Sequence, residues 1–82
     1  MNTAHEDLHE DQVVFIRLPE VKKLTSLGTT KIYVMASEGL FPKQVPLGGR
    51  AVAWVKSEVL QWNKDQLAAA RGNQTAATNE SK

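Results

Sequence analysis

Residues that could support catalysis or bind a metal ion are few in this sequence. His5 and His9 are four residues apart, so both could lie on one face of a helix and bind a metal. They fall in a polar, acidic segment with little apolar surface to offset the entropy of ordering, so we interpret them as part of a solvated arm. The chain has no cysteine, and Gly48-Gly49 lacks the following lysine that a Walker motif requires. We therefore expect a protein that is not an enzyme and uses no cofactor or metal.

A second group of residues has the chemistry for contacts with double-stranded DNA. Thr29, Thr30 and Lys31 stand at the start of a predicted helix, where recognition helices present side chains to the major groove. Lys31 could equally be a solvated surface lysine. Tyr33 could place its hydroxyl on a phosphate or be a half-buried core residue, and the sequence leaves both interpretations open.

Arg50, next to two glycines, is the sharper indication of DNA binding. Glycine lets a backbone approach DNA closely, and a guanidinium suits a phosphate or the minor groove. Lys43, on the other flank of the same segment, is a second predicted phosphate contact. We expect Trp54 and Trp62 in the core, because stacking on single strands needs exposed aromatic residues interleaved with cations.

The distribution of charge is more informative than the net charge of +1. Residues 1–12 hold four acidic residues and no Lys or Arg, whereas residues 13–71 hold nine basic and four acidic residues, a net charge of +5. A mildly basic domain is attracted to phosphate backbones.

No apolar stretch is long enough to span a membrane, and the acidic start does not match a signal peptide, so we expect a cytoplasmic protein.

Short elements, separated by Gly and Pro residues, must position these side chains. Residues 13–16 (VVFI) are a predicted strand, and a short helix begins at Leu18-Pro19 and breaks at residues 26–28. Thr29 or Thr30 is expected to cap a second helix, which stops at Gly39. Spacing of i, i+3, i+4 predicts that its buried stripe consists of Ile32, Met35 and Ala36.

A β-hairpin and a final helix complete the predicted domain. Apolar residues flank Gly48-Gly49, which predicts a hairpin over residues 45–54, with Arg50 near its tip and Pro46 in an edge strand. The last helix is predicted from about Lys56 to Arg71, with Gly72 as its stop. Its predicted buried face consists of Val55, Val59 and Trp62, broadened by Leu60 and Leu67.

The order strand, helix, helix, hairpin, helix predicts a winged helix-turn-helix, a mainly α fold with a small β-hairpin wing. We expect a disordered acidic arm at residues 1–12, a DNA-binding domain at residues 13–71 and a disordered tail at residues 72–82.

Five blocks of sequence, in this order and at these spacings, carry a resemblance to a known family. They are RLPEV (17–21), TSLGTTKIY (25–33), EGLFPKQV (38–45), LGGRAVAW (47–54) and SEVLQW (57–62). Together they closely resemble the AlpA family of prophage regulators. The resemblance implies a winged helix similar to those of excisionases and MerR-type regulators. It also implies a regulator from a prophage or genomic island that acts on an integrase gene, or an excisionase.

The resemblance places a recognition helix at about residues 29–37 and a wing at about residues 43–53, with Arg50 at the position of the family's wing arginine. The sequence departs from the family pattern in three places: glycine replaces a capping serine at position 28, valine replaces an arginine at position 34, and glutamine replaces a proline at position 44. Lys31, one turn before Val34, could restore the lost charge.

Three functions remain open at this point. The first is a sequence-specific transcription regulator, and the second is an excisionase that binds and bends attachment-site DNA. The third is a protein-interaction module, against which the +5 charge of residues 13–71 argues. Double-stranded DNA is the expected partner, with integrase or RNA polymerase as further candidates. The last helix lacks sustained heptads, so we expect a monomer or weak dimer that assembles on repeated sites.

Overall fold

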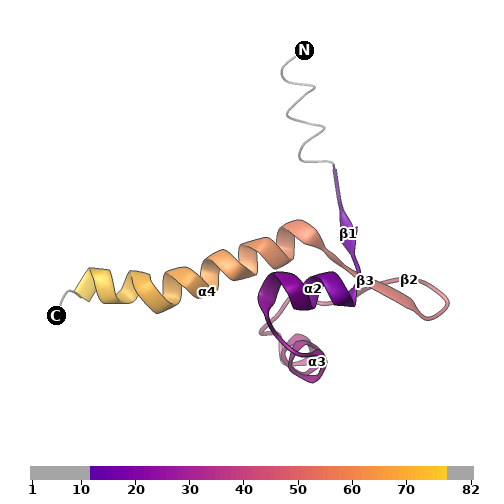
Figure 1. The fold of residues 1–82 in the computed structure, drawn as a ribbon, viewed down its shortest axis with the longest axis horizontal. Helices are drawn as coiled ribbons and strands as arrows, with labels where there is room; N and C mark the ends of the chain where they lie inside the picture. Colours follow the sequence, from indigo (N-terminus) through magenta and orange to yellow (C-terminus); the bar gives the residue numbers. More distant parts are fainter. Residues whose placement is uncertain (1–11, 78–82) are drawn as a thin grey trace, which may run out of the picture.

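The computed structural model describes residues 12–77, with side chains described for residues 12–72, and this part of the chain contains three helices and a three-stranded sheet (Figure 1). In chain order the elements are β1 (Phe15–Ile16), α2 (Leu18–Thr25), α3 (Thr29–Ser37), β2 (Val45–Gly48), β3 (Ala51–Val55) and α4 (Lys56–Ala77). This order confirms the predicted winged helix-turn-helix. Most of the predicted acidic arm and the end of the predicted tail lie outside the described residues.

The sheet is antiparallel and has the strand order β1-β3-β2. Pro46 pairs with Val52 and stands in the edge strand β2, as predicted, where its missing N–H removes no hydrogen bond to a further strand. The strand predicted at residues 13–16 is shorter in the structure, because only its last two residues pair with β3.

The core lies where α2, α3, β3 and the start of α4 meet. The largest fully buried side chains are those of Val21, Ile32, Trp54 and Val59, and each comes from a different one of these elements. Their packing therefore holds the two helices of the helix-turn-helix against the sheet and the last helix. Trp54, predicted as a core residue, donates a 3.2 Å hydrogen bond from Nε1 to the carbonyl of Pro42.

Local hydrogen bonds fix the turn between α2 and α3. Ser26 takes the left-handed conformation at φ 66°, and its N–H donates to the carbonyl of Lys22 at 2.7 Å. The Thr25 hydroxyl donates to the carbonyl of Val21 at 2.8 Å and accepts from the N–H of Leu27 at 3.2 Å. These bonds satisfy backbone groups that the end of α2 leaves without helical partners.

The prediction that Thr29 or Thr30 caps α3 is wrong. Gly28 is the N-cap, with an extended backbone, and its carbonyl accepts the first helical bond from the N–H of Ile32 at 3.1 Å. Thr29 and Thr30 already belong to the helix, so neither occupies the extended position from which a side chain caps.

The last helix, α4, is longer and more exposed than predicted. Gly72 does not end it: the helix continues to Ala77, Gly72 has no positive φ, and glycine inside a helix costs only about 0.5–1 kcal/mol. The prediction that Leu60 and Leu67 join the buried face is also wrong, because they are 38% and 52% exposed. Figure 1 shows that α4 leads away from the other described elements, so Leu67, on a later turn, lies beside none of them. Leu60 directly follows the buried Val59, and consecutive residues are about 100° apart around a helix, so Leu60 points away from the buried side.

Candidate nucleic-acid interface

The helix α3 presents one face to the core and the other to solvent. Ile32 and Ala36 are buried, and Val34, on the opposite side of the helix, is 45% exposed. Met35, predicted in the buried stripe, is only half-buried. The other exposed side chains of α3 are those of Thr29, Thr30, Lys31 and Ser37. Three predicted contact residues at the start of α3 are thus accessible to a partner.

Tyr33 differs from those three residues because it is half-buried. Its ring meets that of Trp54 edge to face, with centroids 5.8 Å apart and planes at 66°. This contact joins α3 to β3, so the ring has the structural role that the sequence left as one alternative. The hydroxyl makes no hydrogen bond to any residue in the described part of the chain.

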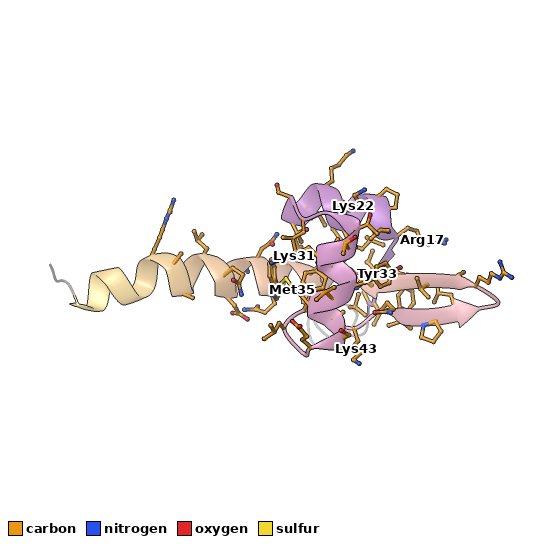
Figure 2. All side chains as sticks on the ribbon, turned by 90° about the horizontal axis from the view of Figure 1, so that it is seen from below. Arg17, Lys22, Lys31, Tyr33, Met35 and Lys43 are labelled. Carbon is orange, nitrogen blue, oxygen red and sulfur yellow. The ribbon has the colours of Figure 1, made fainter. Side chains whose placement is uncertain are left out.

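Arg50 lies in the turn that joins β2 to β3. Gly48 and Gly49, which precede it, have φ values of 109° and 55°, in the region that favours glycine. Arg50 is exposed and forms no ion pair with another described residue. In both views the hairpin and the far end of α4 point in opposite directions (Figures 1 and 2). The turn therefore holds Arg50 at the outer end of the wing.

Further cations lie toward both ends of α3. Figure 2 shows Arg17 and Lys22, from the N-cap and body of α2, toward the end of α3 that carries Lys31, and Lys43, from the loop before β2, toward the opposite end. All three are exposed. We name the exposed face of α3, these three cations and Arg50 together the α3–wing surface.

Sequence reasoning did not single out Arg17 and Lys22 as contact residues. Their place in the predicted first helix could have indicated them, because the first helix of a helix-turn-helix crosses the DNA backbone, where its cations can contact phosphates.

The acidic residues of the described part lie outside α3 and the hairpin. Neither α3 nor the hairpin contains Asp or Glu, although Glu38 is the C-cap of α3. A carboxylate oxygen of Glu20 lies 4.0 Å from Lys56 Nζ, and Glu58 and Asp65 of α4 line a hollow together with Lys43. The exposed face of α3 and the hairpin therefore carry no carboxylate of their own, whereas Lys43 has two carboxylates in its neighbourhood.

Two tryptophans hold the loop that joins α3 to β2. Trp62 Nε1 donates to the carbonyl of Leu40 at 2.8 Å, and the Trp62 ring meets Phe41 edge to face with centroids 4.9 Å apart. Trp54 bonds the carbonyl of Pro42 in the same loop. These contacts fix the backbone that carries Lys43. Phe41 is a buried residue that sequence reasoning missed.

Two kinds of feature, a metal-binding cluster and a membrane-spanning helix, are not found in the described part of the chain. No group of three or more His, Cys, Asp or Glu side chains there is placed to hold a metal ion. None of the described helices is both long and apolar enough to cross a membrane. His5 and His9 lie outside the described residues.

Comparison with known proteins gives a family and one relative. The family described as Prophage CP4-57 regulatory protein (AlpA) matches residues 14–67, from the start of the sheet into α4. The uncharacterized protein ORF88 of Enterobacteria phage P4 is 46% identical over 54 residues. That match covers 66% of this chain and 61% of the phage protein, so it spans less than two thirds of the relative's length. No solved structure gives a significant match.

Proposed function

The chain belongs to the AlpA family of prophage regulatory proteins, and from this premise we propose that it is a sequence-specific DNA-binding transcription regulator. It acts on integrase or excision genes of a prophage or genomic island, binds DNA without catalysing a reaction, and works in the cytoplasm. The observation that carries the proposal is the α3–wing surface, where an accessible helix and an accessible hairpin turn bear cations and no carboxylate.

The shape of this surface suits the major groove. The groove admits an α-helix and has a phosphate backbone along each side. Arg17 and Lys22 lie toward the N-terminal end of α3, and Lys43 lies toward its C-terminal end (Figure 2), so cations are available for phosphates at both ends of the inserted helix. Thr29 and Thr30, at the helix N-terminus, have hydroxyls that can donate to a phosphate or a base edge, and the helix dipole also favours a phosphate there.

The wing extends the contact beyond the groove. Arg50 lies at the outer end of the hairpin and is exposed, so its guanidinium can reach a phosphate or the minor groove beside the site of α3. The Gly48-Gly49 turn adds no side-chain bulk next to it, which lets the backbone approach DNA closely.

One such module forms a small interface. Single modules bury about 600–1,000 Å² of surface on DNA, so one copy binds weakly. We propose a monomer or weak dimer that gains affinity by occupying repeated sites, with integrase or RNA polymerase as a candidate neighbour on the DNA.

Footprinting tests the proposal. The full chain is placed on DNA from its own upstream region, from the nearest integrase promoter and from the attachment arm, beside Arg50→Ala and Lys64→Ala. Lys64 is the matched control, because it is an exposed cation on α4, outside the α3–wing surface. We expect protection of a promoter, lost in Arg50→Ala and retained in Lys64→Ala.

Two other outcomes would replace this function. Protection of repeated attachment-arm sites, together with DNA bending, would identify an excisionase. Absence of protection on every fragment, by a chain whose circular dichroism shows it to be folded, would indicate that the helix-turn-helix docks on a protein.

A further inference from the structure

Val34 occupies the outermost position on α3. With 3.6 residues per turn, Thr30, Val34 and Ser37 form one stripe along the helix, opposite the buried pair Ile32 and Ala36. Val34 is the middle of that stripe and is 45% exposed. A partner that meets the middle of α3 from the solvent side therefore contacts Val34.

The chemistry of this stripe is dominated by methyl groups. None of its three side chains has the paired donors or acceptors with which Arg, Asn or Gln read guanine or adenine. The Ser37 hydroxyl already donates to the carbonyl of Val34 at 2.8 Å, so its proton is engaged. Besides the Thr30 hydroxyl, the stripe presents two methyl groups of Val34 and one of Thr30. In the major groove, thymine is the base that presents a methyl group of its own.

We propose that Val34 packs against the 5-methyl group of a thymine, so that α3 selects T·A base pairs at the centre of its contact. The proposal rests on the proposed function, because it requires α3 in the major groove. Packing the exposed methyl groups of Val34 against an apolar group removes them from water, and this burial is favourable. Lys31 flanks the stripe and supplies charge, so base selection and general attraction come from different residues of α3.

Replacement of thymine by deoxyuridine tests the contact directly, because deoxyuridine keeps the base pairing and lacks the 5-methyl group. The full chain first selects a duplex from a random-sequence library, and each thymine of that duplex is then replaced in turn. Loss of one buried methyl group predicts about fourfold weaker binding at one or two positions. Val34→Ala should bind the thymine and deoxyuridine duplexes almost equally. Lys31→Ala, the control, should weaken both and keep their ratio.

Equal affinity of the wild-type chain for every substituted duplex would overturn the proposal, and so would an unchanged thymine preference in Val34→Ala. Because Val34 is exposed, the variant should keep the wild-type circular dichroism, and Val34→Thr, which retains one methyl group, should keep part of the preference. Salt-dependent binding with no thymine preference would overturn this proposal and leave the proposed function standing. Failure of selection to enrich any duplex would overturn both.

Discussion

Replacing Gly48 with alanine tests how far the wing depends on the backbone of its turn. Gly48 has φ 109°, which L side chains rarely adopt, and no atom lies within 4 Å of the place where a Cβ would stand. The effect of alanine is therefore backbone strain without a steric clash, and strain of this kind costs about 1–3 kcal/mol. Gly49→Asn is the matched control. Gly49 has φ 55°, in the left-handed helical region that asparagine tolerates, so this change should cost less than about 1 kcal/mol.

Urea denaturation, followed by tryptophan fluorescence, measures both variants. With a slope of about 1 kcal/mol per M for a small protein, Gly48→Ala should lower the midpoint by about 1–3 M. This is an upper limit, because the hairpin can release strain by opening locally. The displaced turn should also weaken DNA binding as Arg50→Ala does, whereas Gly49→Asn should leave binding unchanged. Wild-type stability and affinity in Gly48→Ala, or equal losses in both variants, would refute the reasoning.

Three further changes test the fold that supports the surface. Ile32→Ala should lower the free energy of unfolding by about 2–5 kcal/mol, because the side chain of Ile32 is fully buried in the core. Thermal unfolding measures this loss, and a loss below about 1 kcal/mol would contradict the packing. Asn63→Ala removes a 2.9 Å hydrogen bond to the carbonyl of Leu24 and should lower the free energy of unfolding, measured by urea denaturation, by about 1–2 kcal/mol. An unchanged free energy of unfolding would show that water replaces the amide as the donor to this carbonyl. Gly72→Ala should raise the helical signal at far-ultraviolet wavelengths, because alanine favours the helix by about 0.5–1 kcal/mol, and a lower signal would contradict a helix that continues to Ala77.

The sequence was sufficient to predict the elements where Gly and Pro residues limit them. The second helix, predicted between the break at residues 26–28 and Gly39, matches α3 apart from its cap, and the hairpin follows from Gly48-Gly49 between apolar runs. Pro46 in an edge strand was predictable because proline cannot donate to a further strand. These features depend on local backbone conformation, which residue type largely determines.

Features that depend on tertiary neighbours were not predictable in the same way. Leu67 lies near the predicted buried face of its helix, but helical spacing does not show how far along α4 the rest of the domain extends. Phe41 stands in a loop without periodicity, and its burial depends on Trp62, which is distant in sequence. The threonine cap failed for a local reason, because α3 begins one residue earlier than the cap required.

The candidate site was partly predictable. Lys31, Lys43 and Arg50 could be selected by charge and place in the chain, and the structure leaves all three exposed. The approach of Arg17 and Lys22 to the same surface depends on the angle between α2 and α3, which residue spacing does not supply.

The salt dependence of DNA binding tests most directly the central claim that the α3–wing surface binds a phosphate backbone. Affinity of the full chain for a labelled duplex of mixed sequence is measured from about 50 to 200 mM salt, beside Arg50→Ala and Lys64→Ala. A linear fall of log affinity with log salt is expected, with a slope smaller by about 0.9 in Arg50→Ala and unchanged in Lys64→Ala. A wild-type slope near zero, or identical slopes for the wild type and Arg50→Ala, would contradict the account.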